Sequence, residues 1–332
     1  METLRWGILG TAKIARNSII PALRQADYCE LTAIASRDAG RAEEVARDME
    51  ISKAYGSYEE LLDDSDIDVV YLPLPNHLHV EWIEKAVMAG KHVLCEKPLA
   101  LRSADIQRLI ELRERTGRLI GEAYVVLHQP RLRDLKELLE SGEIGRLQSV
   151  DGCFFLDSRD PENIRNKYKE GGGGLWDIGV YPIVCGRWMF GGEPTRVACV
   201  LTMDEVFGVD RLASGVMEFP GGGQLTFSCG TRNPRHTCLT LFTDTHRVEV
   251  LSPFSTDPAL KSDFELYDGN VLSSTRVYSF LPSDQYALEC DHFVESIETG
   301  TPYAGSLEHS LENTRVMEAL FRSARSGRWE EV

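Results

Sequence analysis

Short apolar runs alternate with amphipathic stretches along the first 123 residues of the chain. The apolar runs span 4–9, 31–35, 67–72, 91–95 and 119–123. Between them, apolar positions recur at helical spacing over 39–49, 80–89 and 103–116. Strands that alternate with helices in this way predict an α/β domain over 1–123, built on a doubly wound parallel sheet.

The pattern changes after Leu147, where apolar and polar residues alternate with a period of two. The alternating stretches span 150–155, 196–203, 215–219, 224–229, 236–242 and 246–251. Glycine-rich turns such as 221–223 separate them. The pattern is typical of antiparallel strands, so we expect an α+β domain over 124–332 that is built on an open, mainly antiparallel sheet. The helices expected in this half span 132–141, 283–298 and 307–326.

Length, composition and charge fit two packed domains and narrow the range of partners. A chain of 332 residues with 42% hydrophobic residues is long enough for two cores. The formal charge of −16 disfavours nucleic acid and anionic membrane as partners. No apolar run approaches the roughly 18 residues of a membrane span. Because Met1–Trp6 leads directly into a strand, we expect no signal peptide and a cytoplasmic location.

The eight cysteines are scattered through the sequence without a CxxC pair. Most of them stand in apolar surroundings, which is typical of buried, reduced thiols in a cytosolic protein. We therefore expect neither disulfides nor zinc ligands, and no metal site.

A degenerate nucleotide-binding motif follows the first strand. Residues 10–15 read Gly-Thr-Ala-Lys-Ile-Ala, which matches G-x-G-x-x-G with alanine at the second and third glycine positions. Small residues there let a backbone approach a pyrophosphate at a helix N-terminus, although many ordinary strand-to-helix turns look alike. In the helix that follows, Pro21 predicts a break near Ile20.

Ser36 and Arg37 follow the second strand, where an NAD enzyme would carry an acidic residue that binds the ribose. A hydroxyl and a guanidinium suit a 2′-phosphate, so we predict NADP in preference to NAD. In the alternative interpretation, Ser36 caps the next helix and Arg37 is merely exposed.

Two further polar stretches end at the same edge of the predicted sheet, where open parallel sheets bind their ligands. The proline-stiffened loop 73–79 carries Asn76 and His79, which either line the nicotinamide or stabilise the loop. In the stretch 93–99, Val-Leu-Cys-Glu-Lys-Pro-Leu, an apolar run ends at a Glu-Lys pair. Lys97 there can donate to a substrate oxygen or lower the pKa of a neighbouring acid; alternatively the pair is solvated.

One segment of the second half breaks the strand pattern. A polar loop over 160–167 is followed by four glycines, 171–174, and then by Leu-Trp-Asp-Ile-Gly-Val-Tyr-Pro over 175–182. Asp177 and Tyr181 are four residues apart, so on a helix they present a carboxylate and a phenol on one face. The alternative is a glycine hinge before an ordinary helix with Tyr181 in the core.

These motifs resemble those of the glucose–fructose oxidoreductase/inositol dehydrogenase (Gfo/Idh/MocA) family. The stretches that carry the resemblance are Gly7–Ala12, Pro75–His79, Glu96–Pro98 and Gly171–Tyr181. The resemblance spans nearly the whole chain and is greatest for the NADP-linked branch of dihydrodiol dehydrogenase, D-xylose dehydrogenase and the sugar ketoreductases. It implies a Rossmann domain, a cis peptide bond between Lys97 and Pro98, and a homodimer or homotetramer paired through the second sheet.

The sequence departs from the xylose-type pattern in one place. Those members usually continue with aromatic-Met-x-Arg-x-His-Pro, whereas 124–130 reads Tyr-Val-Val-Leu-His-Gln-Pro. The missing arginine argues against a simple aldose as the substrate. Because sugar ketoreductases tolerate a Leu-His pair at this place, the resemblance still allows His128 to face a sugar.

The resemblance implies an NADP-dependent oxidoreductase that transfers a hydride between a sugar, keto-sugar or related polyol and C4 of the nicotinamide. Tyr181 would act as general acid/base, Lys97 would hydrogen-bond the reacting oxygen, and Asp177 would position either the sugar or Lys97. The expected substrate contacts are Lys97, His128, Asp177 and Tyr181. The expected cofactor contacts are Gly10, Thr11, Ala12, Ile14, Ser36, Arg37, Leu72, Pro73, Asn76, His79, Glu96, Lys97, Arg165 and Trp176.

Two alternatives to a dehydrogenase stay open at this point. One is a glycoside hydrolase that uses a retained NAD(P) by an oxidation and elimination route. The other is a non-catalytic NADP-sensing regulatory module, because a cofactor fold alone does not establish catalysis.

Overall fold

The computed structural model describes residues 1–254, 257–269 and 271–332, which form two compact units. The first unit comprises 1–128 and 284–311, and the second comprises 129–283 and 312–332. The division therefore differs from the expected boundary between residues 123 and 124. The reason is that helix α8 (Gln285–Thr299), late in the chain, packs against α1 (Ile20–Gln25) of the first unit.

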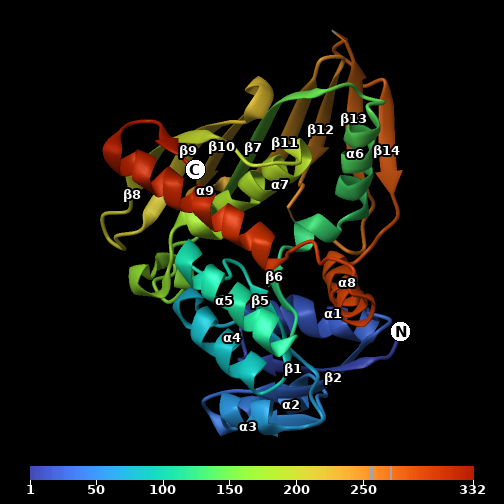
Figure 1. The fold of residues 1–332 in the computed structure, drawn as a ribbon, viewed down its shortest axis with the longest axis vertical. Coiled ribbons are helices and arrows are strands. Elements are labelled where there is room, and N and C mark those ends of the chain that lie inside the picture. Colours follow the sequence, from blue (N-terminus) through green and yellow to red (C-terminus); the bar gives the residue numbers. More distant parts are fainter. Residues whose placement is uncertain (255–256, 270) are drawn as a thin grey trace. The chain divides into compact units, whose positions relative to one another are not determined.

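The first unit contains a six-stranded parallel sheet with the order β3-β2-β1-β4-β5-β6 (Figure 1). The strands are β1 (Leu4–Leu9), β2 (Cys29–Ala35), β3 (Lys53–Tyr55), β4 (Val69–Leu72), β5 (His92–Glu96) and β6 (Ile120–Ala123). The prediction of a doubly wound sheet is confirmed, although the three-residue β3 was not expected. The order reverses between β1 and β4, which is where such sheets bind ligands.

Helices cover both faces of this sheet and bury two apolar cores. The helices are α1, α2 (Ala39–Asp48), α3 (Tyr58–Asp63), α4 (His79–Met88), α5 (Ser103–Thr116), α8 and the start of α9 (Leu307–Ser326). One core includes residues of α3, α4 and α5, and the other includes residues of α1, α2 and α8. Successive residues of β4 enter opposite cores, with Tyr71 in one and Leu72 in the other, as the pleat of a strand requires.

The helix before α1 changes its hydrogen-bonding pattern near Ile20, where a break or kink was predicted, but its backbone stays helical there. A π turn, η1 (Ala15–Ile19), gives way to regular α-helix at Ile20, with Pro21 in the first turn of α1. Proline has no amide hydrogen to donate, so the change in hydrogen-bonding pattern accommodates it without ending the helix.

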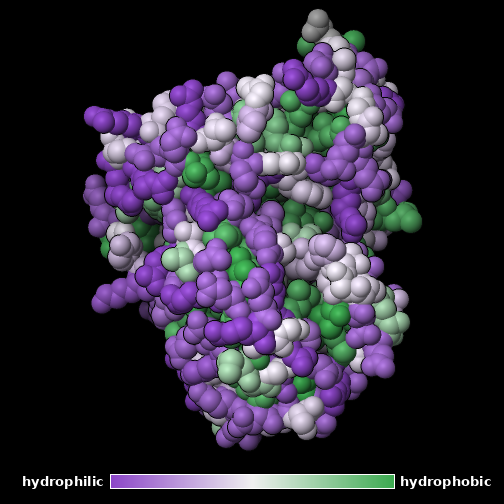
Figure 2. All heavy atoms as spheres, in the orientation of Figure 1, coloured by the Kyte–Doolittle hydropathy of each residue, from purple (hydrophilic) through white to green (hydrophobic). Residues whose placement is uncertain are grey.

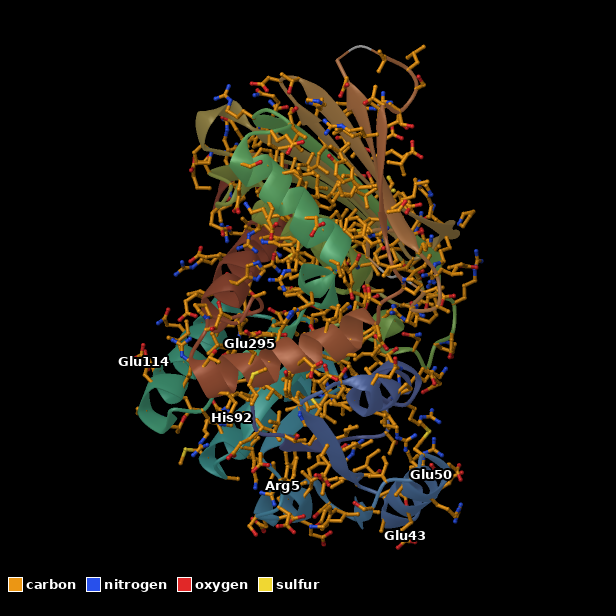
Figure 3. The ribbon with its side chains drawn as sticks, turned by 90° about the vertical axis from the view of Figure 1, so that its right-hand side faces the viewer. Arg5, Glu43, Glu50, His92, Glu114 and Glu295 are labelled. Atoms are coloured by element: carbon orange, nitrogen blue, oxygen red, sulfur yellow. The ribbon has the colours of Figure 1, made fainter. Side chains whose placement is uncertain are left out.

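Hydrogen bonds link polar side chains at the amino ends of the strands, and Figure 3 labels two of these residues, Arg5 and His92. Arg5, in β1, donates to Asp68 through Nε (2.9 Å) and Nη2 (3.0 Å). His92, the first residue of β5, accepts from the amide of Leu119 at 2.9 Å and contacts Arg118 at 3.1 Å. Burial, with the charge of Arg118, lowers the pKa of His92 to about 4, so its ring is neutral near pH 7.

The second unit contains a nine-stranded sheet with the order β14-β13-β12-β11-β7-β10-β9-β8-β15. The strands are β7 (Leu147–Asp157), β8 (Arg196–Met203), β9 (Asp210–Glu218), β10 (Gln224–Gly230), β11 (Arg232–Thr243), β12 (His246–Leu251), β13 (Ser262–Asp268), β14 (Arg276–Phe280) and β15 (Glu330–Glu331). Only the pairing of β7 with β10 is parallel among the described strands of this sheet, so the mainly antiparallel prediction is confirmed. Strands β13, β14 and β15 were not expected.

Helices α6 (Pro130–Ser141) and α7 (Val180–Phe190) pack against this sheet, with α7 on β7. The other face carries exposed apolar side chains, including Val200 (72% exposed) and Leu251 (66%). Elsewhere the surface is largely hydrophilic on the side shown in Figure 2, as the charged composition leads one to expect. The remaining short helical turns are η2 (Asn76–Leu78), η3 (Val125–His128), η4 (Ile164–Asn166), η5 (Tyr168–Glu170), η6 (Leu175–Gly179) and η7 (Pro220–Gly222).

Candidate active site

The turn after β1 has the geometry that a pyrophosphate requires. Gly10 has a φ of +114°, in the region that favours glycine, and its amide donates to the carbonyl of Ala35 at 2.9 Å. A Cβ atom at Gly10 would stand only 3.2 Å from Leu74 Cδ2. The helix opens at Lys13, so its positive end lies where β1 ends. The predicted contacts Thr11, Ala12 and Ile14 belong to this turn, which fits a dinucleotide.

Arg37 lies beside the same turn. Its guanidinium hydrogen-bonds the hydroxyl of Tyr58, and this hydroxyl is 3.7 Å from the place a Cβ atom of Gly10 would occupy. Ser36 does not cap the next helix: its Oγ accepts from the amide of Asp38 at 3.2 Å, and Asp38 caps α2. A hydroxyl and an exposed guanidinium therefore stand next to the turn, as a 2′-phosphate would need.

The loop after β4 holds its polar residues in two different ways. Leu72 and Pro73 are buried, and Asn76 begins the short turn η2 at the same edge of the sheet. His79 is fully buried, with Nδ1 2.8 Å from the carbonyl oxygen of Pro98 and Nε2 2.7 Å from that of Leu74. Burial lowers its pKa, so the neutral ring has one N–H and donates to one carbonyl at a time.

Both ring nitrogens of His79 lie at hydrogen-bonding distance from backbone carbonyl oxygens, which favours loop stabilisation over the other predicted role, lining the nicotinamide. His79 connects the loop after β4 to the loop after β5, which makes it a supporting residue for the edge. The alternative interpretation, loop stabilisation, describes its contacts.

The Glu-Lys-Pro stretch lies at the carboxyl end of β5, and its surroundings are largely polar. The peptide bond between Lys97 and Pro98 is cis, as the family resemblance implied. Glu96 accepts a hydrogen bond from the hydroxyl of Tyr71, and Lys97 is partly exposed. The amide of Leu99 donates to Oε1 of the buried Glu122 at 2.8 Å, which fixes the chain just after the lysine.

A group of buried polar residues lies on the α8 side of the first unit. Glu289 is fully buried, and burial together with the charge of Glu96 raises its pKa well above the usual range. The hydroxyl of Tyr303 contacts Glu289 at 3.4 Å, and the ring of Tyr303 stacks on His128 at 5.3 Å. His128 is only 2% exposed and its Nδ1 lies 2.8 Å from Nδ1 of His292. These contacts describe a packing residue and give no support to the predicted sugar contact of His128.

In the second unit, the four glycines bring a charged loop against the start of the α7 segment. Gly173 has a φ of +127°, and a Cβ atom there would lie 2.1 Å from Oδ1 of Asp210. Asp210 in turn accepts from the amide of Leu175 at 2.6 Å. The amide of Gly173 donates to the carbonyl of Arg165 at 3.0 Å, and the amide of Asp177 donates to that of Gly173. Arg165 and Asp177 are thereby held together.

Arg165, Asp177 and Tyr181 form one polar cluster in this unit. Arg165 donates to the carboxylate of Asp177, and the charges of Asp177 and Tyr181 contribute to a raised pKa of the guanidinium. Asp177 stands in the π turn η6, a departure from regular helix that recurs at functional sites. The ring of Tyr181 packs on Phe154 and Phe254, at 5.6 and 5.7 Å, but the residue stays partly exposed. Tyr181 is therefore not sealed in the core.

Trp176 has a different environment from the other candidates of this segment. It is 9% exposed and its ring stacks on Phe321 of α9 at 5.8 Å. These contacts favour a packing role over the predicted cofactor contact.

Three supporting residues escaped the sequence analysis: Tyr71, Glu122 and Asp210. Tyr71 and Glu122 bond the two sides of the Glu-Lys-Pro stretch, and Asp210 bonds the start of η6. The one available signal was a polar residue inside an otherwise apolar strand, as with Glu122 in Leu119–Ala123. That signal does not say which atom the side chain will bond.

Models of known protein families match three segments of the chain. Residues 4–124 match the model described as "Oxidoreductase family, NAD-binding Rossmann fold". Residues 132–251 match the "GFO/IDH/MocA C-terminal domain", and residues 265–332 match the "Oxidoreductase family, C-terminal alpha/beta domain". The chain belongs to the GFO/IDH/MocA oxidoreductase family.

Individual members of the GFO/IDH/MocA family match over nearly the full chain. An uncharacterised oxidoreductase from Rhizobium meliloti is 42% identical over 100% of both chains. An NADP(+)-linked D-xylose 1-dehydrogenase from Haloferax volcanii is 35% identical over 98% of both. A 3-ketoreductase from Actinomadura kijaniata, solved with NADP and TDP-benzene, is 30% identical, with a TM-score of 0.88 over 97% of this chain and 98% of that one.

Membership of the GFO/IDH/MocA family confirms the prediction of an NAD(P)-dependent oxidoreductase with a Rossmann domain. The prediction of NADP as the cofactor agrees with the two relatives that are named or solved with it. Among the described residues, no helix is both long and apolar enough to span a bilayer.

Proposed function

We propose that this protein is an NADP-dependent oxidoreductase of sugars, keto-sugars or related polyols. The nicotinamide of bound NADP accepts or donates the hydride at C4. The chain supplies binding, orientation and proton transfer at the carbon–oxygen bond that is oxidised or reduced. The observation that carries the proposal is Tyr181, a partly exposed phenol with its ring fixed by two phenylalanines and an Arg165–Asp177 ion pair beside it.

In this proposal, the hydroxyl of Tyr181 exchanges the proton of the substrate hydroxyl. A tyrosine hydroxyl has a pKa near 10, so a neighbouring cation is needed to favour the phenolate. Arg165 is one such charge, but Asp177 already balances it. The further cation is Lys97, which donates to the reacting oxygen and stabilises the negative charge on the phenol. Lys97 belongs to the first unit and Tyr181 to the second, so their convergence is itself part of the proposal.

The remaining residues of the site have positioning roles. Asp177 orients sugar hydroxyls through its carboxylate, which the ion pair with Arg165 holds in place. Gly10 to Ile14 bind the pyrophosphate, and Ser36 with Arg37 binds the 2′-phosphate. His79, Glu122 and Tyr71 act through the backbone and side chain of the Glu-Lys-Pro stretch rather than by touching the ligands.

The sugar class of the substrate is supported by the relatives. One is named as a D-xylose dehydrogenase and another as a 3-ketoreductase solved with NADP and TDP-benzene. We also propose that two or four copies pair through the open face of the second sheet, because Val200 and Leu251 would otherwise leave apolar surface in water.

Absorbance at the nicotinamide band, with NADP and with NAD, against a panel of sugars and keto-sugars tests the proposal. We expect turnover with NADP and at least one substrate of the panel. Lys97→Met and Tyr181→Phe should each lower turnover by about 10²- to 10⁴-fold, the usual contribution of proton transfer, while NADP still binds. Tyr278→Phe, on the outer strand β14, is the matched control and should keep full activity.

Three results would contradict the proposal or replace it. Full turnover in Tyr181→Phe would remove the assigned role. Nucleotide that stays bound, with sugar hydrolysis and no net change in absorbance, would indicate the glycoside hydrolase alternative. NADP binding without turnover on any member of the panel would indicate the regulatory module.

A further inference from the structure

Two cysteines face each other across the middle of the second sheet. Cys153 of β7 and Cys238 of β11 are direct partners in the antiparallel register, and their sulfur atoms are 3.1 Å apart. Both are free thiols and both are partly exposed. They lie on the open face of the sheet, in the row that continues to Ser228 and Ser214 on one side and to Leu251 on the other.

A histidine completes a set of three ligand atoms on this face. His236 stands two residues before Cys238 on the same strand, so its side chain points to the same face. One ring nitrogen of His236 and the two sulfur atoms all lie within 4.8 Å of one another. Among the residues that the structure describes, this is the only group of three or more possible metal ligands with such spacing.

We propose that Cys153, His236 and Cys238 bind a zinc ion. Two thiolates and an imidazole are the ligands that zinc prefers, and two thiolate charges balance the charge of Zn²⁺. Zinc holds sulfur at about 2.3 Å and nitrogen at about 2.0 Å in a tetrahedron, which places ligand atoms about 3.5–4 Å apart. The ligand atoms are already near these separations, since the two sulfur atoms are 3.1 Å apart and all three atoms lie within 4.8 Å of one another. On binding, each thiol gives up its proton to solvent, and no electron transfer is needed.

The site is separate from the proposed hydride chemistry. Phe154, the neighbour of Cys153, points to the opposite face of the sheet, where its ring contacts Tyr181. The zinc ion would therefore join β7 to β11 on one face, while the other face supports Tyr181. The fourth position of the tetrahedron lies on the open face of the sheet, beside the exposed His236, and a ligand from outside this chain fills it.

The proposal revises the expectation, drawn from the sequence, that the cysteines include no zinc ligands. The ligands come from strands 85 residues apart in the chain, counted between Cys153 and Cys238. The His-x-Cys stretch 236–238 is too short to be recognised as a metal motif by itself. The third ligand, Cys153, is found only from the strand register, which places it opposite Cys238.

The test uses the full chain, reduced and freed of metal, with Zn²⁺ and with Co²⁺ as a spectroscopic probe. We expect one equivalent to bind, with a sulfur-to-cobalt charge-transfer band and a higher unfolding temperature. Cys153→Ser and Cys238→Ser should abolish the band. His236→Ala should lower the metal affinity by at least about 10- to 100-fold, which is the usual loss when a residue that only supports a metal ligand is removed. NADP affinity should stay the same in all three.

Cys29→Ser is the matched control, because Cys29 is a partly exposed cysteine that pairs with Cys290 in the first unit. It should keep the band and the affinity of the parent chain. Metal binding that survives in Cys153→Ser and Cys238→Ser, or that is lost in Cys29→Ser, would overturn the proposal. The absence of stoichiometric metal binding would also overturn it. A Cys153–Cys238 disulfide in protein isolated without reductant would overturn it too, because it would assign the pair to redox chemistry. None of these results depends on the activity of the enzyme.

Discussion

At the scale of single residues, the candidates divide into those that can touch ligands and those that support them. Lys97, Arg37 and Tyr181 are partly or fully exposed at the positions where the sequence placed chemistry. His79 and Trp176 are buried, and their contacts are with protein. The sequence predicted the residues of both groups as site candidates, because they have suitable side chains and stand in the motifs. Only their tertiary contacts show which residues can touch a ligand and which support the site.

Arg37 gives the sharpest test of cofactor choice. Replacing it with alanine removes a charge-assisted hydrogen bond to the 2′-phosphate, worth about 1.5–3 kcal/mol, so NADP should bind about 10- to 100-fold more weakly. NAD lacks this phosphate and should bind as before. Equilibrium titrations with both nucleotides measure the effect.

Arg41→Ala is the control for this prediction, because Arg41 is an arginine of the next helix that pairs with Glu44. It should change neither affinity. An equal loss of NADP and NAD affinity in Arg37→Ala would mean that Arg37 does not read the 2′-phosphate.

At the scale of elements, the α/β alternation of the first unit was clear from hydrophobic periodicity, and so were most strands of the second. The strands that escaped are β3, β13, β14 and β15. Three of them, β3, β14 and β15, lie at sheet edges, where few buried positions mark them, and β13 has only three buried residues. The π turn η6 escaped as well, and the hydrogen bond at its start, from the amide of Leu175 to Asp210, joins residues that are distant in sequence.

The close approach at Gly173 predicts a local effect on the site. Alanine there would place a Cβ atom 2.1 Å from Asp210 and would have to adopt a positive φ, a strain of order 1–3 kcal/mol. We expect Gly173→Ala to lower the free energy of unfolding by about that amount and to lower kcat by displacing Asp177. Urea unfolding and steady-state kinetics measure the two effects.

Gly192→Ala, in the turn after α7, is the control, since an added Cβ atom there meets nothing within 4 Å. It should leave stability and kcat nearly unchanged. Wild-type kcat in Gly173→Ala would show that the glycine run does not position Asp177.

At the scale of the whole molecule, buried neutral histidines make stability depend on pH. The pKa of His92 is about 4 in the fold and about 6.5 when unfolded, so the unfolded chain binds a proton first as the pH falls. The stability that His92 contributes is complete above pH 6.5 and is lost progressively as the pH falls from 6.5 to about 4. His79 acts in the same direction, because burial lowers its pKa too.

His92→Gln tests this dependence. Between pH 7.5 and pH 5, the parent chain should lose about 2 kcal/mol more of its free energy of unfolding than the variant does. Urea denaturation at the two pH values measures both losses. Equal losses in parent and variant would mean that His92 does not titrate as its burial requires.

The whole-molecule claim of this account is that two distant stretches, Glu96–Pro98 and Gly171–Tyr181, act on one nicotinamide. The sequence predicted both stretches and their chemistry, but their convergence depends on how the two units meet. A double-mutant cycle in kcat/KM with Lys97→Met and Tyr181→Phe measures it most directly. The account predicts that the double variant is about as slow as the slower single variant, because the two groups serve one proton transfer. Losses that multiply, as for independent sites, would contradict it.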